Sequence, residues 1–378
     1  MQAETLSPLV QNLRDAIERS SEKAISFAQF MKTVLYHPQW GYYSSEKQRI
    51  GKEGDYYTSL SLHPVFAQVL AEGFCRVAEV LWPQGEVSLV EFGGGEGRMA
   101  RQVMDVVAAS APELYARIRY YLLESHPSRV CQDVISPHAE RVDVVVDWRE
   151  VRMVEGIVFS NEFVDALPVH VLVGEGGAVK ELAVAWEPSR GFQFRTLALA
   201  NEALRRYVKE TALVLADGEQ VEVNLEAQDW LEHVSRMLAK GMLLTIDYGG
   251  LAEELPRRGT LRAYSEHRVS SRILQNAGNQ DITADVNFTD LIRWGKFVGM
   301  APCPLVSQGE FLRHWGILSL LQDGASDPFC EAARKNRAIR QLILPEAGMA
   351  GRFQALLQVK GLADAEKSAL LRRGLLFD

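Results

Sequence analysis

The stretch Val87-Ser-Leu-Val-Glu-Phe-Gly-Gly-Gly-Glu-Gly97 decides the fold that the rest of the chain can adopt. Residues 87–92 are rich in branched and aromatic side chains and too few for a buried helix, so they predict a strand buried on both faces. The glycines that follow lack Cβ atoms, so the backbone can turn tightly and approach a ligand. A helix beginning near Arg98 would offer its N-terminus to that ligand. The stretch therefore predicts a nucleotide-binding strand, turn and helix.

The spacing of these glycines separates two classes of ligand. A dinucleotide fingerprint reads Gly-x-Gly-x-x-Gly, with a pyrophosphate at the helix N-terminus. Here an acid stands two residues before a Gly-x-Gly-x-Gly run, which resembles the first motif of Rossmann-like S-adenosylmethionine (SAM) methyltransferases, whose acidic residue answers the charged methionine moiety. The alternative is a tight turn that binds nothing. The motif contributes these candidate cofactor residues: Glu91, Gly93, Gly94, Gly95 and Gly97.

Composition restricts the partners of the protein. With 378 residues, 47% hydrophobic and 24% charged, the chain has the make-up of a globular protein with a large core. A net charge of −8 argues against nucleic acid and favours a small molecule or a protein as partner. Four cysteines without a Cys-x-x-Cys pair suggest neither a metal site nor disulfides. No membrane span or targeting segment is recognised, so we expect the cytoplasm.

Strands and helices alternate along most of the chain. This alternation predicts a parallel α/β sheet of the Rossmann-like class I SAM-methyltransferase type, with helices on both faces and ligands at the carboxyl ends of the strands. The strands are expected at 87–92, 118–124, 142–147, 156–168, 242–247 and 353–360, and the helices at 63–81, 98–109, 226–239, 288–297 and from 308 across the 330s. The fourth strand exits into a polar loop, with the turn Ser160-Asn161-Glu162 at its end.

The predicted organisation has two parts. Residues 1–84 are expected to form an N-terminal helical and loop cap that contributes to the site, and residues 85–378 the Rossmann-like domain. Two insertions interrupt that domain: residues 174–225, with an antiparallel hairpin, and residues 250–287, which read as irregular. A loop this long in a compact domain is usually functional or mobile.

Glu124 ends the second predicted strand. A carboxylate in that place can accept hydrogen bonds from both ribose hydroxyls of an adenosine. The alternative is an acid that stabilises the N-terminus of the following helix. The other candidate cofactor residues follow strands or lie in the loop before residue 60: Ser125, Asp147, Trp148, Thr58 and Ser59.

A set of motifs in one order resembles a known family over nearly the whole chain. The motifs are Leu35-Tyr-His-Pro-x-x-Gly-Tyr-Tyr43, Gly54-Asp-Tyr-Tyr-Thr-Ser59, the glycine-rich stretch, Asn161-Glu-Phe-x-Asp-Ala-Leu-Pro-Val-His170, Asp247-Tyr-Gly249, Gly259-Thr-Leu-Arg262 and Asp281-Ile-Thr-Ala284. Together they are similar to the MidA-type SAM-dependent methyltransferases. The mitochondrial member of that family is a complex I assembly factor that symmetrically dimethylates an arginine. The chain departs from the family pattern at Leu60, Asp285 and Asn287, where the family commonly has Pro, His and Asp.

The resemblance implies methyl transfer to a nitrogen, with arginine of a protein substrate as the acceptor. Such an enzyme must align the nucleophile and manage one proton. We expect Glu162 to orient the guanidinium, with Asp165 as a second acid and Asn161 as a polar contact to the cofactor or the acceptor amine. Asp165 is equally compatible with a helix N-terminal acid. Three residues are expected to line the acceptor side, with loop packing as the alternative for the tyrosine and a local hydrogen bond for the histidine: His37, Tyr43 and Asp55.

Two other functions stay open on the sequence alone. The first is a non-catalytic assembly factor that binds SAM or nothing and holds a partner protein; the altered segment 281–288 favours it, and the retained glycine motif and Glu124 oppose it. The second is an NAD-dependent enzyme, which the glycine spacing disfavours. The expected partners are a protein substrate and a second copy of the chain in a homodimer.

Overall fold

The computed structural model describes residues 6–44, 63–265, 268–323, 330–344 and 351–377. Three candidate site residues, Asp55, Thr58 and Ser59, lie outside this part of the chain. The chain divides into two compact units. The small-sheet unit comprises residues 1–56, 165–229 and 253–287, and the large-sheet unit comprises residues 57–164, 230–252 and 288–378.

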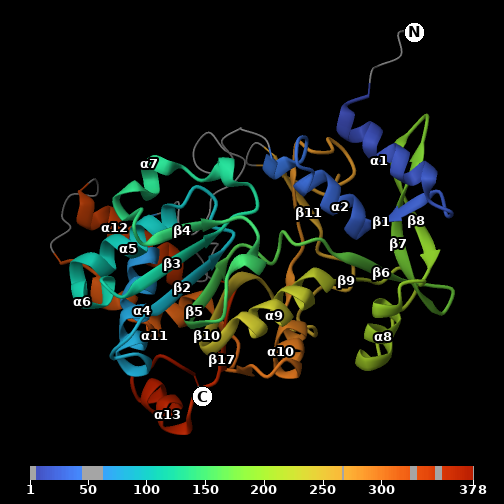
Figure 1. Ribbon diagram of the computed structural model, residues 1–378. Helices are drawn as coiled ribbons and strands as arrows, with labels where there is room; N and C mark the ends of the chain where they lie inside the picture. Colours follow the sequence, from blue (N-terminus) through green and yellow to red (C-terminus); the bar gives the residue numbers. More distant parts are fainter. Residues whose placement is uncertain (1–5, 45–62, 266–267, 324–329, 345–350, 378) are drawn as a thin grey trace. The chain divides into compact units, whose positions relative to one another are not determined.

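The large-sheet unit contains the predicted Rossmann-like sheet (Figure 1). Its strands follow the order β4 (Val142–Val145), β3 (Ile118–Leu123), β2 (Val87–Phe92), β5 (Val154–Asn161), β10 (Leu238–Gly250), β17 (Phe353–Lys360) and β15 (Ala301–Pro302). The first five are parallel to their neighbours, and β17 runs antiparallel to β10. The prediction of a parallel α/β sheet is therefore confirmed. The strand predicted at 353–360 is present as β17, but it runs antiparallel to its neighbour. The carboxyl ends of β2, β3, β5 and β10 meet at one edge, where ligands bind in such sheets.

Helices cover both faces of this sheet. On one face α4 (Val65–Leu81) and α5 (Arg98–Ser110) pack with α11 (Gln308–His314) and α12 (Glu331–Ile343) over alternate strand residues such as Leu89 and Leu244. On the other face α9 (Leu225–Met237) places Trp230 against Phe92. The sequence grouped residues 63–81 with the N-terminal cap, whereas α4 belongs to the large-sheet unit because nearly all of its apolar side chains enter this core.

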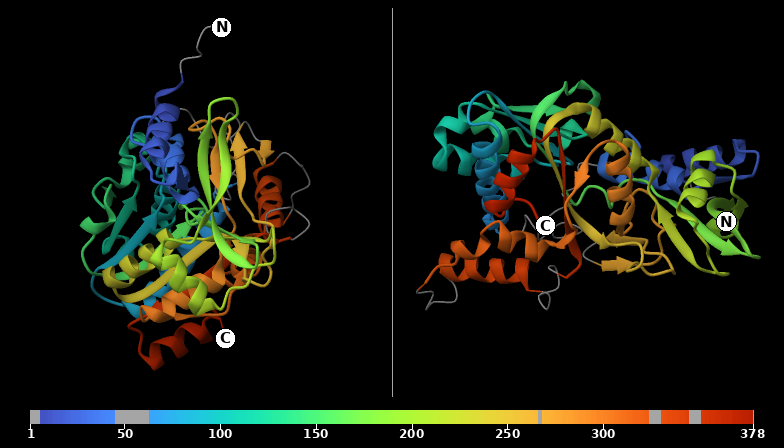
Figure 2. Two further views of the ribbon diagram at one scale, coloured as in Figure 1. Left: turned by 90° about the vertical axis from the view of Figure 1, so that its right-hand side faces the viewer. Right: turned by 90° about the horizontal axis from the view of Figure 1, so that it is seen from below.

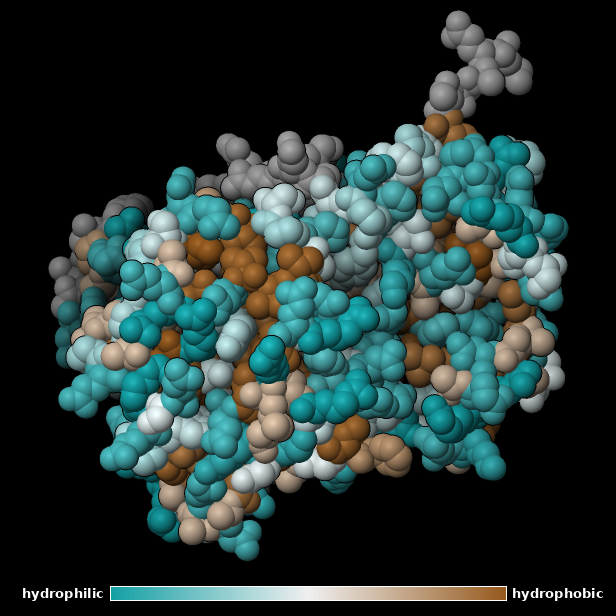
Figure 3. Space-filling view, in the orientation of Figure 1, coloured by the Kyte–Doolittle hydropathy of each residue, from teal (hydrophilic) through white to brown (hydrophobic). Residues whose placement is uncertain are grey.

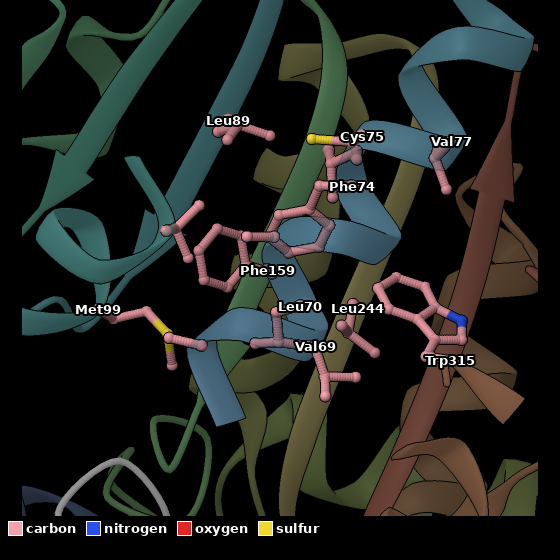
Figure 4. Close-up of a cluster of buried hydrophobic side chains, with 14 of the residues drawn as sticks. Val69, Leu70, Phe74, Cys75, Val77, Leu89, Met99, Phe159, Leu244 and Trp315 are labelled. Atoms are coloured by element: carbon pink, nitrogen blue, oxygen red, sulfur yellow. The ribbon is translucent and has the colours of Figure 1, made fainter. Parts of the chain in front are cut away.

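The centre of this core is aromatic (Figure 4). The ring of Phe74 on α4 lies 5.1 Å from that of Phe159 on β5 and 5.9 Å, edge to face, from Trp315. Gly73 permits this approach, because a Cβ there would stand 2.1 Å from the indole of Trp315. The helix can meet the indole only where it has no side chain.

The predicted continuous helix from residue 308 into the 330s is wrong. Instead α11 ends at His314, a 3-10 turn follows at Ile317–Leu320, and α12 starts at Glu331. Gly316 lies between them with φ +97°, in the left-handed region that ends helices. The break lets α11 and α12 lie side by side (Figure 2).

The small-sheet unit is built on antiparallel strands. Its main sheet has the order β1 (Ala24–Ser26), β7 (Ala178–Glu187), β6 (His170–Glu175) and β9 (Gln220–Val223), and β8 (Gly191–Ala198) pairs with β7 as the predicted hairpin. Helices α1 (Pro8–Arg19) and α2 (Phe27–Tyr36) pack on it, and α8 (Glu202–Thr211) follows β8. The segment 250–287, predicted to be irregular, instead holds a second sheet of β12 (Arg268–Ser270), β11 (Arg262–Ser265) and β13 (Asp281–Thr283). The prediction missed it because these strands are too short to give a periodic signal in the sequence.

The visible face of the molecule intersperses hydrophobic with hydrophilic side chains (Figure 3). Within the described ranges no helix has both the length and the apolar character needed to cross a membrane.

Gly73→Ala tests the close contact between α4 and Trp315. Alanine favours a helix by about 1 kcal/mol over glycine, but the added methyl must displace the indole, so we expect a net loss of roughly 1–3 kcal/mol. Urea unfolding measures the loss. In a Trp315→Leu background the same substitution should cost far less, since the clash is gone. An equal cost in both backgrounds would refute the contact.

Candidate functional site

The glycine loop after β2 is anchored to the neighbouring strand. The N–H groups of Gly93 and Gly94 both donate to the carbonyl of Leu123 at the end of β3, at 3.0 and 3.2 Å. Gly93, Gly95 and Gly97 have φ of +74°, +53° and +86°, in the region that glycine enters without steric cost. The glycine run therefore serves a backbone path that other residues would strain.

Each glycine of the loop meets different surroundings. A Cβ on Gly94 would lie 2.0 Å from the Leu122 side chain, and one on Gly97 would lie 2.6 Å from Ile135. These two positions are filled by the protein's own core. At Gly95 the nearest atom to such a Cβ is a guanidinium nitrogen of Arg129, 3.8 Å away. Gly95 is thus the point where the loop leaves room for a ligand to approach the backbone.

Glu124 closes the loop from the end of β3. Its Oε2 accepts the N–H of Gly95 at 3.0 Å, and its Oε1 accepts the N–H of His126 at 3.1 Å. Two longer contacts, from Arg129 at 3.4 Å and from the Ser125 hydroxyl at 3.5 Å, occupy the remaining acceptor capacity. These weaker contacts are the ones that ribose hydroxyls could replace. The sequence did not indicate Arg129, because its link to Glu124 depends on the turn after β3.

Glu91 lies beneath the loop. Its carboxylate is buried, accepts a 2.6 Å hydrogen bond from the hydroxyl of Tyr120, and would stand 3.4 Å from a Cβ on Gly94. Burial, opposed by the Tyr120 hydrogen bond and reinforced by the charge of Glu124, raises the pKa of the Glu91 carboxyl from 4.5 to about 7. Glu91 therefore supports the loop from below. Its partner Tyr120 was not among the expected site residues.

Asp147 and Trp148 follow the neighbouring strand β4. The Asp147 carboxylate accepts the N–H of Arg149 at 3.0 Å and so caps a 3-10 turn, Trp148–Glu150. The Trp148 ring stacks on His233 at 5.3 Å and meets the edge of Phe92 at 5.8 Å. Asp147 thus stabilises the turn, while Trp148 packs on the buried aromatic ring of Phe92 at the end of β2.

The turn after β5 carries the predicted acidic residue next to the glycine loop. The Phe163 side chain would lie 3.0 Å from a Cβ on Gly93, so this turn contacts the loop directly. Glu162 has φ +53°, and its Oε1 accepts a 3.2 Å hydrogen bond from Nδ2 of Asn161. The Oδ1 of Asn161 is buried and has no hydrogen-bond partner among the residues that the structure describes. A buried acceptor in this state is a place for a ligand's N–H or O–H.

The remaining candidates lie in the small-sheet unit. His37 stacks on Trp40 at 4.6 Å, and its Nδ1 accepts the N–H of Gln39. Tyr43 is 8% exposed and donates a 2.8 Å hydrogen bond to Asp281. His37 thus has a neighbour in sequence as its partner, whereas Tyr43 joins its loop to a distant segment of the same unit.

Asp165 belongs to the same unit, although it follows Glu162 closely in sequence. Its side chain is buried, and its carbonyl accepts the N–H of Ala284 at 3.0 Å. Burial alone would lower the pKa of Arg262, but Asp285, with smaller contributions that include Asp165, raises it above its ordinary value. The structure therefore places Asp165 close enough to Arg262 to interact with its charge.

These features define a class of protein. The structure has a parallel α/β sheet with an acid beneath its glycine loop, a carboxylate at the end of the second strand and an Asn-Glu turn after the fourth. This combination is that of a Rossmann-like SAM-dependent methyltransferase. A family model described as "Putative S-adenosyl-L-methionine-dependent methyltransferase" matches residues 69–303. The chain belongs to that family, and the resemblance to MidA-type methyltransferases is confirmed.

The protein is similar to named relatives along most of its length. The mitochondrial protein arginine methyltransferase NDUFAF7 homolog of Drosophila melanogaster is 25% identical, covering 90% of this chain and 83% of that protein. Human mitochondrial protein arginine methyltransferase NDUFAF7 is also 25% identical, covering 85% and 77%. A Burkholderia thailandensis protein crystallised with S-adenosyl-homocysteine superimposes with a TM-score of 0.84 at 26% identity, covering 98% of each chain.

Gly95→Val tests whether the loop opens toward the cofactor. The valine would fill the space beside Gly95 that the ligand needs, so we expect the affinity for S-adenosyl-homocysteine to fall by roughly 100-fold, a loss of about 2.8 kcal/mol. Calorimetric titration measures it. Gly176→Ala is the matched control, because Gly176 has φ +63° with open space around it and lies in the small-sheet unit. Wild-type affinity in Gly95→Val would sink the assignment.

The buried Glu91 predicts a pH dependence of stability. Because its folded pKa of about 7 lies above its ordinary 4.5, the folded state binds more protons between these values, and stability falls as pH rises through 7. Wild type should therefore lose roughly 2–3 kcal/mol relative to Glu91→Gln between pH 5 and pH 9. Urea unfolding across this range measures both proteins. A constant difference between them would show that Glu91 keeps an ordinary pKa.

Proposed function

We propose that the protein transfers methyl groups from SAM to a nitrogen of a protein side chain, with arginine as the acceptor. The observation that carries this proposal is the Asn161–Glu162 turn, which meets the glycine loop through Phe163 and holds a carboxylate and an amide oxygen without a hydrogen-bond partner in the described part of the chain. The names of the Drosophila and human relatives support arginine as the acceptor. A role in complex I assembly belongs to the same proposal.

The residues of the loop fit SAM. Gly95 leaves space beside its backbone, Glu124 offers a carboxylate at the end of β3, and Asn161 has a buried oxygen that no described residue hydrogen-bonds. When bound, SAM supplies an electrophilic methyl group on a sulfonium. In the proposal Glu124 holds the ribose hydroxyls, the backbone of Gly95 approaches the ligand, and Trp148 flanks it.

Glu162 is assigned the acceptor side of the reaction. A guanidinium is protonated at neutral pH and has five N–H donors in a fixed plane, so a carboxylate can orient one nitrogen and localise the charge on the others. The hydrogen bond from Asn161 Nδ2 fixes the Glu162 carboxylate, and the Oδ1 of Asn161 can accept an N–H of the acceptor or the cofactor. Alignment of this kind accounts for a large share of the rate of a displacement reaction.

We assign no proton-accepting role to Asp285. Asp285 stands there in place of the family's histidine, pairs with Arg262, and donates its N–H to the hydroxyl of Thr260 at 2.9 Å. These contacts tie two segments of the small-sheet unit together. His37, Tyr43 and Asp165 remain predicted acceptor-side residues, and the cytoplasmic location and the homodimer likewise stay predictions.

Glu162→Gln tests the proposed role directly. The amide keeps the size of the side chain but cannot neutralise a guanidinium, so methyl incorporation should fall by about 10²- to 10⁴-fold while SAM affinity stays within threefold. The assay follows the methyl group of labelled SAM into a protein extract of the source cell, and mass spectrometry identifies the methylated residue. Glu150→Gln, an exposed carboxylate on the turn after β4, is the control. Unchanged incorporation in Glu162→Gln would remove this residue from the mechanism, and label on a residue other than arginine would overturn the acceptor assignment.

A further inference from the structure

The backbone at Glu162 is held in an unfavourable conformation. A residue other than glycine in the left-handed region costs about 1–2 kcal/mol, and such a residue persists only where its surroundings fix it. Glu162 has φ +53°, in the middle of that region. Something in the large-sheet unit must therefore hold the turn.

The holding group is the carboxylate of Asp247. Its Oδ2 accepts the N–H groups of Phe163 at 3.1 Å and Val164 at 2.8 Å, and its Oδ1 accepts the N–H of Tyr248 at 2.9 Å. The carbonyl of Ile246 accepts the N–H of Glu162 at 3.0 Å. The end of β10 thus binds three consecutive N–H groups of the turn after β5.

The position of Asp247 suits this task. Ile246 is the register partner of Asn161 in the parallel pair of β10 and β5, so Asp247 is the next residue along, level with the start of the turn. Its side chain is 0% exposed. Hydrogen bonds to a buried carboxylate are among the stronger ones in proteins, and losing one leaves a polar group unsatisfied.

We propose that Asp247 is a positioning residue for methyl transfer, which fixes the left-handed backbone at Glu162 and thereby aims the Glu162 carboxylate and the Asn161 amide at the acceptor nitrogen. This inference rests on the proposed function, since it assumes that Glu162 serves the reaction. Asp247 acts on the reaction through the turn that it binds. Misplacement of an orienting group by about 1 Å can cost around 100-fold in rate.

Asp247→Asn is the main test. The amide replaces one acceptor oxygen by an NH2 donor. With the NH2 toward the turn, the hydrogen bonds from Phe163 and Val164 are lost; with the NH2 toward Tyr248, they keep an acceptor without the charge that makes such bonds roughly twice as strong. Deuterium exchange at the Phe163 and Val164 amides should become at least about 10-fold faster. With labelled SAM and the protein extract, the maximal incorporation rate should fall roughly 10- to 100-fold, while the apparent KM for SAM stays within about threefold. Asp247→Glu keeps a carboxylate but moves it along the longer side chain, so its maximal rate should lie between those of wild type and Asp247→Asn.

Two comparisons distinguish positioning from stability. Asp290→Asn alters another buried acid of the large-sheet unit, which pairs with Arg293 at 3.2 Å, and should lower stability without changing the maximal rate. In a Glu162→Gln background, Asp247→Asn should cause little further loss, because both substitutions disable the same group.

The outcomes separate the inference from the proposed function. Unchanged amide exchange at Phe163 and Val164 in Asp247→Asn overturns the inference. A wild-type maximal rate in Asp247→Asn also overturns it, provided that Glu162→Gln is inactive. Multiplicative losses in the double variant also overturn it. If Glu162→Gln itself keeps the wild-type rate, the proposed role of Glu162 fails, whatever Asp247→Asn does.

Discussion

The site depends on buried carboxylates that bind the backbone of a neighbouring loop. Glu124 at the end of β3 accepts the N–H of Gly95 in the loop after β2. Asp247 at the end of β10 accepts two N–H groups in the turn after β5. In each pair the strands are adjacent and parallel, so the acid of one strand lies level with the loop of the other. The same kind of contact therefore shapes both the proposed cofactor side and the proposed acceptor side of the large-sheet unit.

Unfavourable local features are concentrated around these two loops. Glu91 is a buried acid whose pKa is raised by burial, Glu162 has a left-handed backbone, and Asn161 has a buried oxygen without a hydrogen-bond partner within the described ranges. Each costs free energy that the surrounding packing must offset. The aromatic core of Phe74, Phe159 and Trp315 lies on the same sheet and supplies burial of that kind. Such clustering is typical of sites that bind or react.

Much of this architecture could be predicted from local sequence signals. The glycine run, the branched strand before it and the acid ending the next strand are short patterns whose meaning depends on nearby residues only. Gly95 and Glu124, both predicted cofactor residues, are joined by a hydrogen bond. The turn bearing Glu162 was also expected from its place at a strand end, and Phe163 brings it against the glycine loop.

What escaped prediction depends on contacts between distant segments. Asp247 ends a predicted strand, but its partners Phe163 and Val164 are more than eighty residues earlier in the chain. Arg129 reaches Glu124 only because of the intervening turn. The strands of the sheet containing β11 are too short for a hydrophobic period. The rule that ligands gather at carboxyl strand ends could have indicated Asp247, since β10 lies beside β5.

A crystal structure of the protein with S-adenosyl-homocysteine would show whether the Gly95 loop and Glu124 form the SAM site. We expect the ribose hydroxyls on the Glu124 carboxylate, in place of the contacts that Arg129 and Ser125 now make, with the nucleoside beside Gly95. A nucleoside bound elsewhere, with Glu124 still paired to Arg129, would contradict it.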